Sequence, residues 1–564
     1  MSKTLVPISK AQISRAAIER LYIAMRHLFI RGSYKPLGVS GEAIRDALLD
    51  LEPEIYGTIA DPEKVELDGL LYIFQRLPLG IEECRYVKLI SREGYEKSEF
   101  QALVPAKRRR NCYRIDEEQM YIEMSRGRSD IYDVLTHLSF MYIEAEKISS
   151  HALDHKGRVR REWKQLEEII HKIKAKKKFN LELGITHLST LLGRTYEETA
   201  EAVKLFEKAK KVNSLFNIVY WLGYHSIAEK LKDEDREISF SSTLRENLGM
   251  HIFGSIWAQN LKAHLEERNL LDHQIHIISA NMHSVRNTIY AIGALQTKSN
   301  KKVDLDKLIL ALAQEKTKAK NKKVQAYAEK NGMSQLQDDT GTNIGVQVID
   351  MNQVDKAILP AELKSKSGAK KTSKKVIVVM DYAFGEQAYE CMDELLKPYE
   401  KDNTKIPLDV KSINIMGKAG ILKGEKGDIM VPSAHIFEGS ADNYPFKNSL
   451  TAKELEATGL KVCTGPMITV LGTSLQNKDI LRYFLRSSWK VIGLEMEGAH
   501  YQKAIQAASA IRNNIAKKVT LRYAYYASDN PLLTGSTLAS GGLGAEGVKP
   551  TYAITTAILK GILS

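Results

Sequence analysis

Two acidic side chains stand where an apolar segment ends, a place where chemistry is often done. Glu495 and Glu497 follow the run Val491-Ile-Gly-Leu, and in a strand both would face the same side. A carboxylate buried there needs hydrogen-bond partners or a role in binding or catalysis. It could hold a vicinal diol through two hydrogen bonds, as ribose recognition requires. The alternative is a structural carboxylate that accepts hydrogen bonds from the backbone or from an arginine.

A third acid, Asp529, follows the aromatic and apolar segment Tyr523-Ala-Tyr-Tyr-Ala-Ser. Burial beside such residues disfavours the charged form and raises the pKa, as a general acid at neutral pH requires. The alternative is an Asx turn or a helix cap before Pro531, for which aspartate is also favoured. The sequence therefore indicates a candidate acid without excluding a structural role.

Glycines flank a lysine in the segment Gly417-Lys-Ala-Gly420. We expect a turn here, between a strand and Ile421-Leu-Lys, in which the backbone N–H groups approach an anion or a sugar closely. Lys418 suits a phosphate or another anion at such a position. Tight-turn geometry alone would also explain the two glycines.

These candidates follow β-type runs that alternate with helical segments. The runs are 273–280, 346–350, 375–380, 411–416, 461–464, 490–496 and 519–527, and a helix is expected over 285–295. Strands separated by helical lengths predict an α/β domain with a largely parallel central sheet flanked by helices, over residues 271–564. Ligands bind such sheets at the carboxyl ends of the strands. A lysine-rich segment near 298–342, with one amphipathic helix near 305–314, is interpreted as an insertion.

Residues 1–270 have the apolar spacing of a mostly helical domain, for example over 131–148 and 197–212, with a strand-like segment at 86–90. Its role, in regulation or in assembly, is unknown. The basic cluster 105–114 could be a solvated turn, a set of salt bridges between subunits, a nucleic-acid contact or a phosphate-effector site. His137 and Glu144 lie seven residues apart and could be hydrogen-bonded core residues or a metal pair.

The composition excludes several classes of protein. The 564 residues carry a net charge of +13, and 43% are hydrophobic, as in an ordinary globular protein. No run of about 18 apolar residues predicts a membrane span, and no secretory signal opens the chain. Four dispersed cysteines argue against a zinc site or disulfides. We therefore expect a cytoplasmic protein that lacks metal and cofactor. Much of the excess charge lies in lysine-rich linkers, so nucleic acid is not expected as a partner.

Five motifs in order resemble the nucleoside phosphorylase/nucleosidase superfamily, over about residues 270–564. They are Ile275–Ala291, Asp381–Leu396, Gly417-Lys-Ala-Gly with Gly427-Asp-Ile-Met-Val-Pro432, Glu495-Met-Glu, and Ser528-Asp. Among its members the bacterial AMP nucleosidases are the most similar, through the Gly-Lys-x-Gly segment and Glu438-Gly-Ser-Ala-Asp-Asn-Tyr444. The resemblance implies a nucleoside-phosphorylase-like sheet and cleavage of a purine N-glycosidic bond.

The resemblance also implies a role for each matching residue. Asp529 would protonate the purine N7, Glu497 would hold the ribose hydroxyls, and Met496 would lie against the sugar. An anion or nucleophile pocket would be lined by Gly417, Lys418 and Gly420 and faced by Arg286. The base pocket would include Thr473, Ser474 and Leu475.

Three departures from the family pattern bear on the reaction. The segment 381–385 lacks the paired glycines, no acid ends the first strand, and no arginine precedes Gly417 as a phosphate clamp. Hydrolysis of AMP, giving adenine and ribose 5-phosphate, is therefore favoured over phosphorolysis with inorganic phosphate. A non-catalytic nucleotide sensor is the remaining alternative. A homo-oligomer is expected.

Overall fold

A computed structural model describes residues 9–295, 305–313, 318–364, 374–440, 442–533 and 544–564. The chain forms two compact units, Met1–Met250 with Ser474–Ile480 and His251–Thr473 with Leu481–Ser564, here called the first and the second unit. Helix α10 (Ile252–Glu267) therefore belongs to the second unit, although the division was placed at 270 from the sequence. Parts of the lysine-rich segments, 298–304, 314–317 and 365–373, lie outside the described residues.

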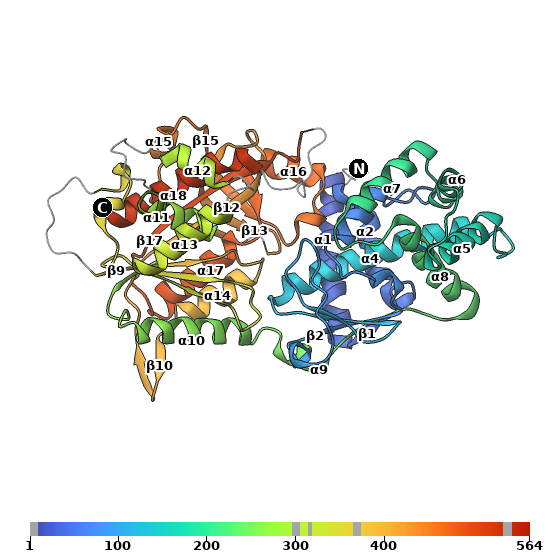
Figure 1. Cartoon of the computed structure of the whole chain (residues 1–564), viewed down its shortest axis with the longest axis horizontal. Helices are drawn as coiled ribbons and strands as arrows, with labels where there is room; N and C mark the ends of the chain where they lie inside the picture. The colour runs from blue at the N-terminus through green and yellow to red at the C-terminus, as the bar shows by residue number, and fades with distance from the viewer. Residues whose placement is uncertain (1–8, 296–304, 314–317, 365–373, 441, 534–543) are drawn as a thin grey trace, which may run out of the picture. The chain divides into compact units, whose positions relative to one another are not determined.

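The second unit is built on one sheet, with ten strands among the described residues. The strands are β6 (Gln274–Ser279), β7 (Met333–Leu336), β8 (Val346–Asp350), β9 (Lys375–Met380), β12 (Val410–Ile421), β13 (Ile429–Phe437), β14 (Asn443–Pro445), β15 (Val462–Thr469), β16 (Gly493–Glu495) and β17 (Thr520–Asp529). Strands β8 and β9 have the bounds that the apolar runs predicted. A small hairpin of β10 (Tyr399–Lys401) and β11 (Thr404–Ile406) projects beside α10 (Figure 1).

Five of these strands close into a ring. Strand β12 pairs with β17, β17 with β13, β13 with β15, β15 with β16, and β16 again with β12. The strands β6, β9, β8 and β7 continue the sheet from the other edge of β12. The sheet is mixed rather than largely parallel. Strand β16 is antiparallel to β12, β17 is antiparallel to β13, and β8 is antiparallel to both of its neighbours.

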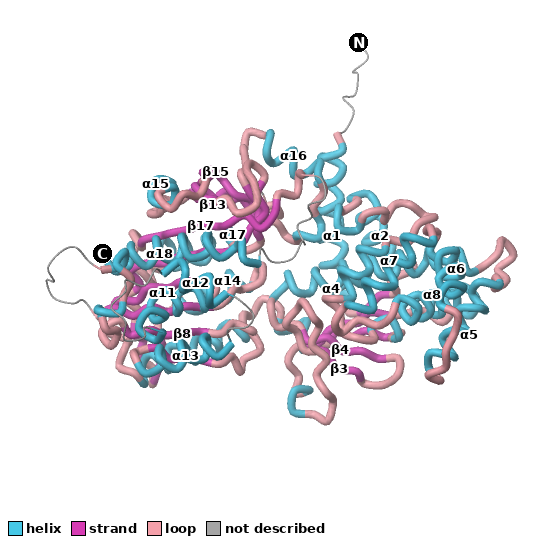
Figure 2. Tube along the Cα trace, turned by 45° about the horizontal axis from the view of Figure 1, so that its top comes forward, coloured by secondary structure: helices cyan, strands magenta, loops and turns pink. Residues whose placement is uncertain are grey.

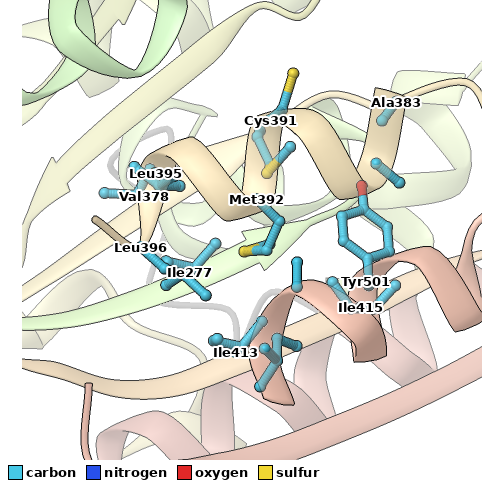
Figure 3. Close-up of a cluster of buried hydrophobic side chains, with 14 of the residues drawn as sticks. Ile277, Val378, Ala383, Cys391, Met392, Leu395, Leu396, Ile413, Ile415 and Tyr501 are labelled. Atoms are coloured by element: carbon cyan, nitrogen blue, oxygen red, sulfur yellow. The ribbon is translucent and has the colours of Figure 1, made fainter. Parts of the chain in front are cut away.

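Side chains alternate across each strand, so both faces of this sheet carry apolar residues, and helices cover both faces. Ile277 and Val378 face a core that they share with α10, α14 (Gln387–Leu395) and α17 (Gly498–Gln506). Figure 3 shows this core, with Cys391 and Met392 of α14 above Ile413 and Ile415 of β12. The adjacent strand residues face a second core. Its helices are α11 (Met282–Leu295), α12 (Leu305–Ala313), α13 (Lys318–Lys330) and α18 (Val548–Leu563). The predicted α/β class, a central sheet flanked by helices, is confirmed.

The first unit is mostly helical, as predicted, but it also contains a five-stranded sheet. Its helices are α1 (Lys10–Arg31), α2 (Glu42–Leu51), α3 (Leu67–Phe74), α4 (Gly127–Ala152), α5 (Arg161–Lys174), α6 (Leu181–Leu192), α7 (Tyr196–Lys208), α8 (Leu215–Lys232) and α9 (Ser242–Asn247). The sheet order is β1 (Ser33–Tyr34), β5 (Glu237–Phe240), β2 (Tyr86–Ile90), β4 (Gln119–Glu123) and β3 (Cys112–Arg114). In Figure 2 the long helix α4 runs above β3 and β4. Within the described parts of both units, no helix is long and apolar enough to cross a membrane.

Candidate active site

Asp529 is the last residue of β17, and its side chain is buried. The Ser528 hydroxyl donates a hydrogen bond to Oδ1 of Asp529 at 2.5 Å. The other oxygen, Oδ2, is buried without a hydrogen-bond partner among the described residues. Burial raises the pKa of Asp529, while the Ser528 hydrogen bond and the Lys418 charge oppose this shift. A carboxyl group with a raised pKa and one oxygen that no protein group holds is suited to donating a proton.

Gly420 connects this acid with the carboxylates of β16. In β12, Gly420 pairs with Asp529 of β17 on one side and with Leu494 of β16 on the other. With strands about 4.8 Å apart, the backbones of Asp529 and Leu494 lie about 10 Å from each other. Glu495 follows Leu494 directly. The closed ring of strands therefore brings Asp529 and the Glu495-Met-Glu497 segment to opposite sides of the end of β12.

The segment Gly417–Gly420 is not a turn, and that expectation was wrong. These residues belong to β12, which stays paired with β17 through Gly420, with one irregularity between Ala419 and Gly420. The ladder to β17 holds the segment extended, and this partner lies far away in the sequence. A Cβ added at Gly417 would lie 3.7 Å from the rings of Tyr382 and Tyr525. Lys418, the next residue, is exposed.

Both carboxylate oxygens of Glu495 accept hydrogen bonds from the protein. Its Oε1 accepts the Thr469 hydroxyl at 2.5 Å, and its Oε2 accepts the backbone N–H of Glu497 at 2.6 Å and that of Gly498. These bonds satisfy N–H groups at the start of α17. Burial, helped by the charge of Glu497, raises the pKa of Glu495 to about 8. Of the two glutamates, Glu495 therefore takes the structural role that the sequence left open.

Glu497 is only partly buried and precedes α17 as its N-cap residue. Its Oε1 accepts the backbone N–H of Gly385 at 2.9 Å. Gly385 has φ +55° and lies in the loop after β9, the loop that the sequence had singled out over 381–386. Met496, between the two glutamates, is also partly buried. The structure thus brings together the Gly385 loop, Met496 and Glu497, and these face solvent more than Glu495 does.

A buried aromatic cluster supports this region, and sequence reasoning missed it. His435 of β13 is 0% exposed and lies 3.3 Å from the Tyr525 hydroxyl through Nε2. Burial lowers its pKa to about 3, so the ring is neutral. A Cβ on Gly498 would lie 2.2 Å from Cδ2 of His435, so only glycine fits there. The signals were a histidine in an apolar strand and a glycine directly after Glu497.

Arg286 lies on α11, and its guanidinium contacts side-chain amides. It donates to Oε1 of Gln325 at 2.7 Å and, through Nε and Nη2, to Oδ1 of Asn287 at 3.1 and 3.0 Å. Arg286 is 4% exposed, and Asn287 in turn donates to the Tyr552 hydroxyl. These contacts link α11 to α13 and α18. A role toward an anion remains a prediction.

The three residues expected at the base pocket fall in one short 3-10 helix, Thr473–Leu475. Thr473 is partly buried and belongs to the second unit. Ser474 and Leu475 are buried and belong to the first unit. Contact of these residues with a base remains a prediction.

The charged residues singled out in the first unit have partners within that unit. Arg108 and Arg110 of the basic cluster form ion pairs with Asp133 at 3.1 and 2.8 Å, and Arg110 is 2% exposed. His137 bonds the Tyr56 hydroxyl at 2.9 Å, and Glu144 accepts the backbone N–H of Glu66 at 2.8 Å. These contacts are the ordinary partners of buried polar groups, and they favour the structural interpretation.

A potential metal-ligand group in the second unit consists of His251, Asp393 and Glu394, whose ligand atoms lie within 4.8 Å of one another. Asp393 is already paired with Arg512, and Lys397 donates to Glu394 at 2.6 Å. These cations compensate the carboxylates, as a bound metal would otherwise have to do. The group is therefore an ion-pair network.

Residues 42–307 and 296–564 match one family model, described as a family of unknown function (DUF6909). No curated protein matches significantly. A solved structure of a futalosine hydrolase mutant of Helicobacter pylori strain 26695 is 13% identical, with 51% of this chain and 98% of that chain covered and a TM-score of 0.30. The Campylobacter jejuni 5'-methylthioadenosine/S-adenosyl homocysteine nucleosidase is 12% identical, with 51% and 97% covered and a TM-score of 0.31.

Proposed function

The chain belongs to the DUF6909 family of unknown function, and we propose that its second unit hydrolyses the N-glycosidic bond of a purine nucleoside or nucleotide. The observation that carries the proposal is the state of Asp529. Its carboxyl is buried, its pKa is raised, and Oδ2 has no hydrogen-bond partner among the described residues, while Ser528 donates to Oδ1. Buried carboxyls with an unsatisfied oxygen are costly, so a role in chemistry explains why this one is present.

The proposed reaction needs a proton for the leaving base and a negative group for the sugar, and the end of β12 has a residue for each. Glycosidic cleavage passes through a state in which the leaving base gains electrons and the ribose carbon becomes positive. Asp529 would donate its proton to the purine nitrogen and so neutralise the leaving base. Glu497, held by the Gly385 N–H, would bind the two ribose hydroxyls and stabilise the positive sugar. Met496 would lie against the sugar, and water would then add to the ribose carbon and give its proton to the Asp529 carboxylate.

Hydrolysis is preferred over phosphorolysis because the guanidinium of Arg286 already donates to the amides of Asn287 and Gln325. A phosphorylase must bind free phosphate as its nucleophile, and phosphate recognition favours guanidinium groups that can donate two hydrogen bonds. The exposed Lys418, the other cation proposed near Gly417, could contact the phosphate of a nucleotide at the edge of the site. AMP is the substrate that we favour on this basis.

A product screen tests the proposal. The full chain is incubated with AMP or adenosine, with and without inorganic phosphate, and the products are separated by chromatography. We expect adenine and ribose 5-phosphate from AMP without added phosphate. Ribose 1-phosphate formed only with phosphate would make the enzyme a phosphorylase. Binding of AMP without release of base would instead make the unit a nucleotide sensor.

A further inference from the structure

A groove of about 230 Å³ lies on the sheet of the first unit, and its lining includes no residue of the proposed reaction. Its lining comes from the three central strands of that sheet, in the order β5, β2 and β4. The lining residues are Tyr86, Lys88, Gln119, Tyr121, Glu237 and Ser239. Aromatic, cationic, anionic and amide groups thus share one small surface.

The register of the strands places all six side chains on the same face. In the central strand β2, Tyr86 pairs with Gln119 and Glu237, and Lys88 pairs with Tyr121 and Ser239. Residues between them face the opposite side. Those residues are the buried apolar side chains Val87, Leu89, Met120, Ile122, Ile238 and Phe240.

The two faces of the sheet are therefore built differently. On the apolar face, Phe29 of α1 packs against the ring of Phe240 with centroids 5.1 Å apart. On the groove face, Tyr86 is 39% exposed, and the other five lining side chains are only partly buried. A sheet face that carries two tyrosines, one exposed and one partly exposed, presents ring surface for a ligand.

The chemistry of the groove has three parts. The ring of Tyr121 contacts that of Tyr95 edge-on with centroids 5.4 Å apart, which holds it in place. Nζ of Lys88 lies 5.4 Å from the centroid of Tyr121, so a cation stands beside the ring. Glu237 supplies a carboxylate on the far strand. A planar ring, an anionic group and hydroxyl groups would each find a partner here.

We propose that this groove binds a mononucleotide, with its base against a tyrosine ring, its phosphate at Lys88 and its ribose hydroxyls at Glu237. Three strands about 4.8 Å apart give a site about 10 Å wide, which suits one nucleotide rather than a macromolecule. The site lies entirely within the first unit. It would give that unit a ligand-sensing role, and it does not depend on the activity of the second unit.

Binding of AMP to the full chain, measured by isothermal titration calorimetry, tests the groove. The background is the double variant Asp529→Asn and Glu497→Gln, in which turnover is suppressed. We expect Tyr86→Ala and Lys88→Met each to weaken one AMP-binding event at least tenfold. Lys164→Met, at an exposed lysine of α5, is the matched control and should leave binding unchanged. Thermal unfolding of each variant confirms that it is folded.

Three results would overturn the nucleotide assignment. The first is AMP binding that neither groove variant alters. The second is binding of ribose 5-phosphate as tightly as AMP, which would show that the base does not contribute to binding. The third is a single-stranded 12-mer that competes at far lower concentration than AMP, which would indicate nucleic acid. Failure of the proposed hydrolysis appears separately, as no base released by the wild-type chain.

Discussion

Two buried carboxyl groups at strand ends of the second unit differ in how many of their oxygens accept hydrogen bonds from the protein. At the junction of β16 and α17, Glu495 has protein donors on both oxygens, namely Thr469 and the first amides of the helix. At the end of β17, Asp529 has a donor on Oδ1, and its Oδ2 has no hydrogen-bond partner among the described residues. Burial raises the pKa of both groups. Burial therefore raises the pKa whether or not both oxygens have donors, and the two groups differ in the number of oxygens that have one.

The largest effect that would test this difference is on turnover. Asp529→Asn keeps the shape of the side chain and removes the proton, so we expect kcat to fall by about 100-fold or more. The free energy of unfolding should change little, because Ser528 can still donate to the amide oxygen. Asp409→Asn, at an exposed aspartate paired with Lys411, is the control. Steady-state rates with AMP near the wild-type value would remove Asp529 from the chemistry.

The second largest effect should appear at Glu495, on stability. Glu495→Ala leaves the amides of Glu497 and Gly498 and the Thr469 hydroxyl without their acceptor. We expect the free energy of unfolding in urea to fall by about 2–4 kcal/mol. Glu495→Gln keeps an acceptor and should cost clearly less. The comparison fails if Glu495→Ala is as stable as the wild type but as inactive as Asp529→Asn.

Glu497 stands between these two extremes, since it is partly buried and bonded to Gly385. Glu497→Gln weakens charge-assisted bonds to a diol, which are about twice as strong as neutral ones. We expect kcat/KM to fall about tenfold and discrimination against 2′-deoxyribose substrates to be lost. Rates with AMP and 2′-deoxy-AMP measure both. A wild-type enzyme that already ignores the 2′-hydroxyl contradicts the assignment of Glu497 to the ribose.

The pH dependence of stability tests whether Glu495 titrates as its burial implies. Glu495 binds its proton more tightly in the folded state, with a pKa of about 8 against an ordinary 4.5. Between these values the folded chain holds more protons than the unfolded chain, so stability should decrease as pH rises, by at most about 1.4 kcal/mol per pH unit. Unfolding of Glu495→Gln should lack this contribution. Identical pH profiles for the two proteins would show that Glu495 does not titrate in this range.

The smallest effect is expected at Lys418. Because its side chain is exposed, a contact with a substrate phosphate is screened by solvent and salt. Lys418→Met should change kcat/KM for AMP by only about threefold and leave adenosine unaffected. A loss of 100-fold or more, specific to AMP, would show that the lysine is drawn into the site when the nucleotide binds.

The sequence by itself determined the features that depend on local pattern. The apolar runs at 346–350 and 375–380 give strands with those bounds, and the carboxylates at the ends of β16 and β17 were found from the ends of apolar runs. Such features follow from side-chain periodicity and from burial, and residues close together in the sequence are enough to indicate both. The alternation of strands and helices likewise predicted the α/β class.

Only the tertiary structure decided which partners these residues meet. Gly417–Gly420 is extended because β17, about 110 residues further along the chain, pairs with it, and a local pattern of two glycines contains no trace of that pairing. Long-range contacts also give Glu495 its donor Thr469, place His435 against Gly498, and bring Gln325 to Arg286. The ring of five strands sets the first two of these contacts, and the packing of α13 on α11 sets the third. Residue type shows which groups need a partner, whereas topology decides whether the protein or a ligand supplies it.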